Sequence, residues 1–302
     1  MREGRNDKGI NAHLISTVMR TAAYQAMVAI RRQRMTFTEY KKAGYDGKPD
    51  VYTSADEEAQ EIYVRLLRMY FPDYGIIGEE NKLRVPCNHP TSNLWFTVDP
   101  LDGTKAFMRR MSRGIGTMIS LSLDDEVIAA CIGDVMTGEF FWYEPGSIVF
   151  RTCDERHERL AIDTEKSLKD QNIFLDESPW TYPSYIEACA YPPDRGGLFK
   201  KMWIDGGGIG ISMTRLWKGE VGGMVLSSGH DTPWDLNPVL GISRQLGFAF
   251  LYYNEETNDI CFASLLAHKE TKKRSHEFLI IHESRVSEFM NWYAKWFSSR
   301  KK

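Results

Sequence analysis

Two aspartates directly after a buried strand constrain this chain more than any other feature. Residues 95–98, Trp-Phe-Thr-Val, alternate aromatic and β-branched side chains, which predicts a short buried strand. Pro100 has no backbone N–H to give to a sheet, so we expect this strand to end near Asp99. A tight turn there would point the carboxylates of Asp99 and Asp102 into one small volume. Two carboxylates this close repel each other unless a cation neutralises them, and ligands that are all oxygen favour a hard cation such as Mg²⁺.

The two residues after these aspartates are candidate phosphate-binding residues. Gly103 allows the backbone to approach a ligand closely. Thr104 supplies a hydroxyl and a backbone N–H where a helix is expected to begin, and such N–H groups attract anions. Carboxylates that bind a metal beside N–H groups that bind phosphate indicate metal-assisted phosphoryl chemistry.

Two more acidic stretches fit the same site. Glu79 and Glu80 follow the apolar residues 74–77, so they are also expected at the end of a strand. Asp235 follows the loop of residues 229–233 and opens an apolar helix. Because these acids follow or begin apolar elements, we interpret them as parts of a site rather than as surface turns.

At these motifs the chain resembles the inositol monophosphatase family, the lithium-sensitive, Mg²⁺-dependent phosphatases of sugars and nucleotides. That family carries Thr-x-Ala-Asp, Gly-Glu-Glu, Asp-Pro-(Ile/Leu)-Asp-Gly-Thr and Trp-Asp in this order. Here the four motifs lie at residues 53–56, 78–80, 99–104 and 234–235. The resemblance implies an α/β (α+β) fold, a layered αβαβα sandwich. An N-terminal antiparallel sheet with helices would be followed by a smaller C-terminal α/β half.

The resemblance also assigns the metal ligands. They would be the side chains of Glu79, Asp99, Asp102 and Asp235, together with the backbone carbonyl of Leu101. Four carboxylates suit two or three Mg²⁺ ions that share Asp99 and Glu79. The expected activity is hydrolysis of a phosphoric monoester by a metal-activated water, without a phosphoenzyme. The substrate would be a small phosphorylated metabolite similar to inositol monophosphate.

Asp56 and Thr104 are the expected catalytic pair. Asp56 would accept the proton of the Thr104 hydroxyl, so that the threonine oxygen can accept a hydrogen bond from the attacking water. The alternative for Asp56 is an acid that the helix dipole favours at a helix start. Ser54 with Glu57 three residues later predicts a capping box there. Glu80 is expected either to support a metal ligand by hydrogen bonding or to be a solvated neighbour.

The resemblance leaves the substrate open. Inositol monophosphatases usually place a glutamate shortly before Trp-Asp, but residues 227–229 are Ser-Ser-Gly. The 3′(2′),5′-bisphosphate nucleotidases share Asp-Gly-Thr-Lys but usually carry a lysine where Ser212 stands. Histidinol-phosphate phosphatases resemble residues 106–107 and 233–235, yet residues 207–209 replace their Gly-Gly-Asp. Fructose-1,6-bisphosphatase is a further alternative. The candidates for contact with the substrate are His230, Lys105, Arg109 and Arg215.

Two alternatives lie outside the family. A haloacid-dehalogenase-type phosphatase has the motif Asp-x-Asp-Gly-Thr, whereas Asp99 and Asp102 stand one residue too far apart. A catalytically inactive interaction module would lack one of the ligand carboxylates, and none is missing.

The composition argues against two kinds of binding partner. The chain has 302 residues, 42% of them hydrophobic, and a net charge of −3, so we expect neither nucleic-acid binding nor binding to an anionic membrane. The charged N-terminus does not resemble a signal peptide, and no apolar run is long enough to span a membrane. The five dispersed cysteines are typical of reduced thiols in a cytoplasmic protein. The family resemblance suggests a homodimer.

The order of elements predicts two subdomains, residues 1–155 with the metal site and residues 156–302 contributing Asp235 and substrate contacts. Before residue 155 we expect helices over 9–34 and 54–70, loops over 35–50 (a candidate flap) and 81–93, and an antiparallel meander over 117–121, 127–132 and 140–143. Residues 151–170 are expected to be loop-like. Beyond them, helices over 209–217, 234–246 and 283–297 alternate with strands over 223–226, 248–253 and 278–281.

Overall fold

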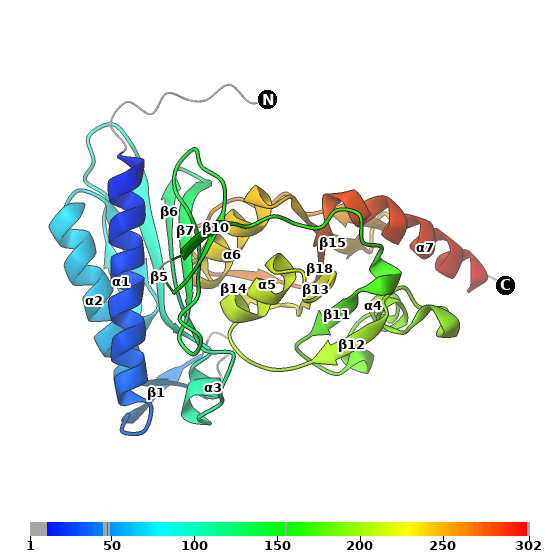
Figure 1. Ribbon diagram of the computed structural model, residues 1–302, viewed down its shortest axis with the longest axis horizontal. Coiled ribbons are helices and arrows are strands. Elements are labelled where there is room, and N and C mark those ends of the chain that lie inside the picture. Colours follow the sequence, from blue (N-terminus) through cyan, green and yellow to red (C-terminus); the bar gives the residue numbers. More distant parts are fainter. Residues whose placement is uncertain (1–10, 45–46, 48, 155, 301–302) are drawn as a thin grey trace.

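The computed structural model describes residues 11–44, 47, 49–154 and 156–300. Five layers follow one another: two helices, a sheet, two more helices, a second sheet, and helices on the outer face of that sheet (Figure 1). The arrangement confirms the layered αβαβα sandwich of the α/β (α+β) class. The α-helices of the described residues are α1 (Ala12–Gln33), α2 (Ser54–Tyr70), α3 (Thr104–Met108), α4 (Ser184–Ala190), α5 (Ile209–Trp217), α6 (Pro233–Gln245) and α7 (Val286–Ser299). Short 3-10 helices lie at Glu80–Lys82, Leu168–Asp170, Pro179–Thr181, Pro193–Arg195 and Glu283–Arg285.

The first sheet has eight strands in the order β10-β9-β8-β7-β6-β5-β3-β4. Its neighbouring strands are antiparallel except β3 and β5, which are parallel. The strands are β3 (Gly75–Gly78), β4 (Arg84–Val85), β5 (Leu94–Asp102), β6 (Gly116–Leu123), β7 (Glu126–Asp134), β8 (Phe140–Tyr143), β9 (Phe150–Cys153) and β10 (Arg156–Arg159). The expected meander is confirmed as β6, β7 and β8.

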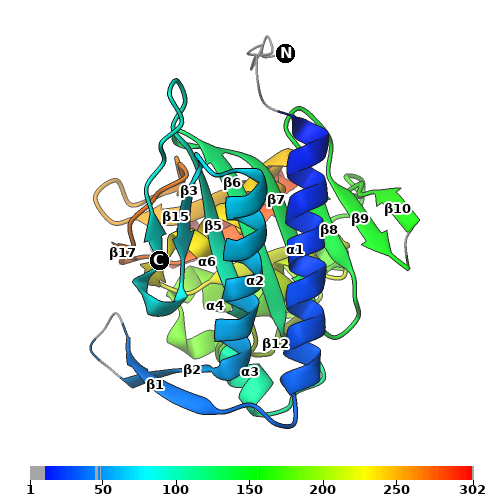
Figure 2. The same ribbon diagram turned by 90° about the vertical axis from the view of Figure 1, so that its left-hand side faces the viewer.

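Helices α1 and α2 lie side by side on one face of this sheet (Figure 2). In α1 the face toward the sheet carries small and apolar side chains such as Ala22, Ala26 and Ile30, all fully buried. The Asn11 side chain accepts the N–H of Leu14 and so fixes the start of the helix. The apolar stripe expected for residues 9–34 is therefore present, although residues 9 and 10 lie outside the described residues.

The second sheet has six strands in the order β12-β11-β13-β18-β15-β16, in which β11 is parallel to β12 and to β13. Helices α5 and α6 lie between the two sheets, with Trp217 and Trp234 buried there. Helices α4 and α7 cover the outer face. The strands are β11 (Asn172–Leu175), β12 (Lys201–Ile204), β13 (Gly223–Leu226), β15 (Phe248–Asn254), β16 (Asp259–Phe262) and β18 (Phe278–His282). A separate two-stranded sheet pairs β14 (Gly229–Asp231) with β17 (Lys272–Arg274).

The prediction of a loop over residues 35–50 is wrong in part. Strands β1 (Glu39–Ala43) and β2 (Pro49–Thr53) form an antiparallel hairpin there. The rings of Tyr40 and Tyr52 lie 5.1 Å apart across the pair, and such aromatic cross-strand contacts stabilise a hairpin that the polar sequence does not suggest. Residues 45–46 and 48 lie outside the described residues, so a role as a flap stays a prediction.

Strand β5 does not end at Asp99 but continues to Asp102. Its pairing with β6 shifts on the way, because Asp99 faces Met118 whereas Asp102 faces Gly116. The longer stretch on β5 is a bulge, and Pro100 lies in it, where a missing N–H breaks no regular ladder bond.

Three other expected loops contain short strands. Residues 81–93 include β4, residues 151–170 include β10 and most of β9, and residues 229–233 include β14. Cys153 pairs with Arg156, so the first sheet continues to Arg159, beyond the position where we divided the chain. The two subdomains, 1–155 and 156–302, stay a prediction.

The last helix is shorter than expected at its start, since residues 283–285 form a 3-10 turn.

Candidate active site

Three aspartates from two distant parts of the chain meet at the end of β5. Asp99 and Asp102 come from the bulge, and Asp235 comes from the first turn of α6. Each offers one carboxylate oxygen, and these oxygens all lie within 4.8 Å of one another. Oδ1 of Asp99 is buried without a hydrogen-bond partner in the described part of the chain. A cation would supply the partner that this oxygen lacks.

The electrostatics of this acidic cluster (Asp99, Asp102 and Asp235) also favour a cation. Burial, followed by the charges of Glu79 and Asp235, raises the pKa of Asp99 well above its usual range. Burial and the charge of Asp235 raise the pKa of Asp102 to about 8. Burial and the charge of Glu79 raise the pKa of Asp235 to about 6. These carboxylates resist ionising together, and an oxygen-binding divalent ion would relieve the repulsion.

Asp102 connects the cluster to helix α5. Its Oδ2 accepts the N–H of Gly210 at 2.8 Å, so the start of α5 is held against the carboxylate. Gly208 makes this approach possible, because a Cβ atom there would lie 2.2 Å from Oδ2 of Asp102. The tight packing gives a physical reason for glycine at the position before α5.

Asp235 is held by the residue that begins α6. The hydroxyl of Thr232 donates to Oδ2 of Asp235 at 2.6 Å, and the N–H of Asp235 lies 3.3 Å from the same hydroxyl. Pro233 occupies the first helical position, where a missing N–H costs nothing. The carboxylate is thereby fixed at the start of the helix, facing the strand end.

Glu79 and Glu80 share the cation Lys42. Nζ of Lys42 donates to Oε1 of Glu79 at 2.8 Å and to Oε1 of Glu80 at 2.6 Å. Glu80 is 1% exposed. The side-chain amide of Gln60 accepts the N–H of Glu80 and donates to the Glu80 carbonyl. Glu80 is therefore not the solvated neighbour that was one of our two alternatives. Sequence reasoning missed Lys42, because it lies in the segment expected to be a loop.

Asp56 and Thr104 lie within hydrogen-bonding distance. The Thr104 hydroxyl is 3.1 Å from Oδ1 of Asp56 and 3.1 Å from the carbonyl oxygen of Leu101. Oδ2 of Asp56 accepts the N–H of Thr53 at 2.7 Å and its hydroxyl at 2.6 Å. Burial raises the pKa of Asp56 to about 6, although these Thr53 hydrogen bonds lower it.

The capping box at the start of α2 is formed by Thr53 and Asp56, not by Ser54 and Glu57. The motif was thus expected one residue too late. Asp56 is at once a helix-start acid and a partner of Thr104, so the two alternatives for this residue are compatible.

A cavity of about 410 Å³ opens beside these groups and is lined in part by Glu79, Gly103 and Thr104. Gly103 has a φ of 87°, and a Cβ there would lie 2.2 Å from the carbonyl oxygen of Gly114. Only glycine fits this turn without strain. Of the expected substrate contacts, Lys105 and Arg109 also line the cavity. Arg215 instead pairs with Asp205 at 3.2 Å, and His230 lies on β14 and does not line the cavity.

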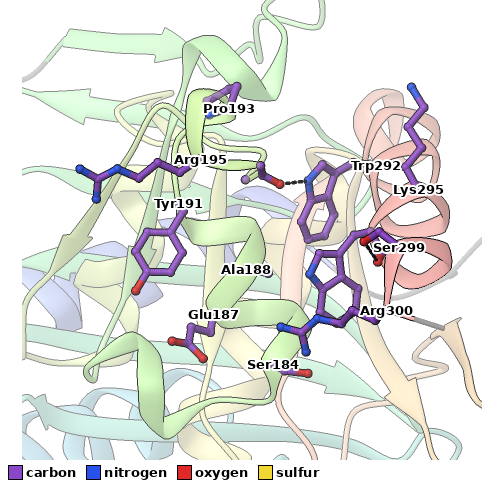
Figure 3. A pocket seen from close by; sticks show the side chains of 13 residues that line it. Ser184, Glu187, Ala188, Tyr191, Pro193, Arg195, Trp292, Lys295, Ser299 and Arg300 are labelled. Carbon is purple, nitrogen blue, oxygen red and sulfur yellow. Dashed lines mark hydrogen bonds between the residues drawn. The ribbon is translucent and has the colours of Figure 1, made fainter. Parts of the chain in front are cut away.

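A second cavity, of about 620 Å³, lies between α4 and α7 (Figure 3). Glu187 and Tyr191 line it from the α4 side, and Trp292 and Lys295 from α7. None of the acids described above lines this cavity.

The fold and the acidic cluster together define a class of layered α/β proteins with carboxylate oxygens gathered at the end of a central strand. The sequence profile of the inositol monophosphatase family matches residues 11–284. The chain therefore belongs to the inositol monophosphatase family.

The chain is similar to individual proteins of this family at low sequence identity. The chain is 26% identical over 138 residues to an inositol monophosphatase of Dictyostelium discoideum, covering 46% of this chain and 50% of that protein. The chain thus spans about half the length of this curated relative. It is 26% identical over 213 residues to a histidinol-phosphatase of Chlorobaculum parvum, covering 65% of this chain and 70% of that protein.

The fold is shared with solved structures. One of them is described as an IMPase/NADP phosphatase complexed with Mg²⁺ and phosphate. It superposes with a TM-score of 0.69 at 15% identity, over 93% of this chain and 95% of that one. Among the described residues, no helix is both long and apolar enough to cross a membrane.

Proposed function

We propose that this protein is a Mg²⁺-dependent phosphoric monoester hydrolase that acts on a small phosphorylated metabolite of the inositol monophosphate kind. The observation that carries the proposal is the buried cluster of Asp99, Asp102 and Asp235, with one oxygen of Asp99 unpartnered. The relatives named inositol monophosphatase and histidinol-phosphatase support the reaction class.

Two or three Mg²⁺ ions would be held by the carboxylates of Glu79, Asp99, Asp102 and Asp235 and by the Leu101 carbonyl. Ions held there would supply positive charge that neutralises the phosphate oxygens and lowers the pKa of a nearby water. Nζ of Lys42 already lies 2.8 Å from Oε1 of Glu79, so a metal at Glu79 would share this carboxylate with the lysine or displace it. The solved relative with Mg²⁺ and phosphate agrees with the choice of metal.

Thr104 and Asp56 would orient the attacking water. The Thr104 hydroxyl has two acceptors within reach, the carboxylate of Asp56 and the Leu101 carbonyl. If the Leu101 carbonyl is engaged as a ligand, Asp56 remains to take the proton. The oxygen of Thr104 then faces the water as an acceptor, while Gly103 allows the phosphate to approach the backbone.

Glu80 would hold Lys42 in place beside Glu79, through its hydrogen bond at 2.6 Å. It thereby tunes the charge at one metal ligand without binding the metal itself. A cytoplasmic location, a homodimer and inhibition by Li⁺ are expected from the family and remain predictions.

A screen for phosphate release tests the proposal. The panel comprises inositol phosphates, histidinol phosphate, fructose 1,6-bisphosphate and adenosine 3′,5′-bisphosphate, each with Mg²⁺ and with a chelator. We expect at least one ester to be hydrolysed with Mg²⁺, and chelation to abolish the reaction reversibly. Full activity after removal of all divalent metal would contradict the proposal, as would a trapped aspartyl-phosphate.

A further inference from the structure

The cations that flank Asp205 and those on and just after α3 differ in what neutralises them. Nε of Arg113 lies 2.6 Å from Asp205, and Nη2 of Arg215 lies 3.2 Å from the same carboxylate. Arg215 also lies over the ring of Phe174, 5.2 Å from its centroid. Arg113 and Arg215 are therefore occupied in holding the segment before α5.

Lys105 and Arg109 are less strongly neutralised by carboxylates of the protein. They stand four residues apart, at the first turn and the end of α3, so they share one face, and both line the 410 Å³ cavity. Within the described residues Arg109 forms no ion pair. Lys105 lies 3.9 Å from Asp50, but both side chains are well exposed, and such a pair contributes little.

Two glycines in the wall of the cavity leave room for a ligand. Gly206 and Gly207 form part of this wall and carry no side chains, and Gly206 has no neighbour within 4 Å of an added Cβ atom. Thr104, Arg109 and Met111 line the same cavity. A substrate whose phosphate lies at Thr104 therefore shares this cavity with both cations and with the glycines.

We propose that Arg109, assisted by Lys105, binds a second anionic group of the substrate. The substrate class would then be metabolites that carry a phosphate or a carboxylate in addition to the reacting phosphate, such as inositol bisphosphates. The planar guanidinium of Arg109 can donate two parallel hydrogen bonds to either group. This inference rests on the proposed function, because it takes the reacting phosphate to lie at Thr104 and the acidic cluster.

Matched pairs of esters test the inference. Inositol 1,4-bisphosphate is compared with inositol 1-phosphate, fructose 1,6-bisphosphate with fructose 1-phosphate, and 3-phosphoglycerate with glycerol 3-phosphate. The last pair separates a carboxylate from a phosphate as the second group. kcat/KM is measured for the wild type, Arg109→Gln, Lys105→Gln and the control Arg110→Gln, whose side chain does not line the cavity.

We expect the wild type to prefer the doubly anionic member of a pair by about tenfold or more, chiefly through KM. Arg109→Gln should lower that preference about tenfold, Lys105→Gln by less, and Arg110→Gln should not change it. The preference should also weaken with added salt. An equal preference in Arg109→Gln and the wild type, or a wild-type preference for the singly anionic esters, overturns this inference alone. No hydrolysis of any ester with Mg²⁺ present overturns the proposed function and this inference with it.

Discussion

Nζ of Lys42 lies 2.8 Å from Oε1 of Glu79, so the hairpin of β1 and β2 places a protein cation on a proposed metal ligand. Burial alone would lower the pKa of Lys42, but the charges of Glu79 and Glu80 raise it, and the ammonium stays charged. A metal ion at Glu79 must therefore compete with Lys42 or share the carboxylate with it.

Removal of this lysine should strengthen Mg²⁺ binding. In Lys42→Met the carboxylates of Glu79 and Glu80 lose their protein cation, so we expect a Mg²⁺ Kd lower by about threefold to tenfold, on the scale of one close charge pair. Lys41→Met, which changes the neighbouring exposed side chain, is the control. Calorimetric titration with Mg²⁺ measures both variants. Weaker binding in Lys42→Met than in Lys41→Met would show that the lysine supports the metal site instead.

Thr104 should matter for the rate and not for metal affinity. Its hydroxyl is 3.1 Å from Asp56, and Thr104→Ala removes the group that orients the water. We expect kcat to fall by about 10²–10⁴-fold, the usual contribution of positioned acid–base groups. Thr104→Ser keeps the hydroxyl and should retain most of the activity. A Thr104→Ala enzyme with the wild-type kcat would remove this residue from the mechanism.

The acids should differ in their effect on metal binding. Asp99 is buried between Glu79, Asp102 and Asp235, and Asp99→Asn should weaken Mg²⁺ binding and abolish turnover. Asp235→Asn should keep one tight site yet lose turnover. Glu80→Gln should be milder than either, because the side chain of Glu80 contacts Lys42. Calorimetry on the three variants gives the order, and greater damage from Glu80→Gln than from Asp99→Asn would reverse our ligand assignment.

The stability of the metal-free protein should fall with rising pH. Burial and Asp235 raise the pKa of Asp102 from 3.8 to about 8, so the folded state holds protons that the unfolded state releases. The stabilisation is fully present below about pH 4 and is lost as pH rises through about 8. We expect the Tm in chelator to drop over this window, and Mg²⁺ to raise the Tm most at its upper end.

The variant Asp102→Asn provides the control for that measurement, since it removes one of the titrating carboxylates. Its Tm in chelator should depend less on pH than that of the wild type. A wild-type Tm that rises with pH in chelator, or a stabilisation by Mg²⁺ that is largest near pH 4, would contradict the electrostatic account of the cluster.

The sequence predicted the parts of the site that depend on local pattern. Asp99 and Asp102 stand at the end of an apolar strand, and Asp235 lies in the first turn of a helix whose polar start is visible in the chain. The structure brings these three together, whereas Glu79, the fourth expected ligand, is not one of the grouped acids and pairs with Lys42. Helix α5 and strand β13 also have the predicted bounds: α5 begins directly after the glycines 206–208, and β13 is the short apolar run Gly-Met-Val-Leu.

The parts that were missed depend on pairing between distant residues or on backbone detail. Lys42 reaches Glu79 only because β1 pairs with β2, and a polar stretch does not reveal that pairing. The capping box could be read at Thr53 or Ser54, and only backbone geometry selects Thr53. Pro100 suggested a strand end, but a bulge accommodates it within β5.

The most direct test of the central claim is to soak a crystal of the protein with Mn²⁺, an oxygen-binding ion that replaces Mg²⁺ at such sites, and to collect anomalous diffraction. We predict a strong anomalous peak among the carboxylates of Asp99, Asp102 and Asp235, and its loss or weakening in Asp99→Asn. An ordered wild-type site with no anomalous peak there, in crystals that bind Mn²⁺ elsewhere, would contradict the assignment of this cluster as the metal centre.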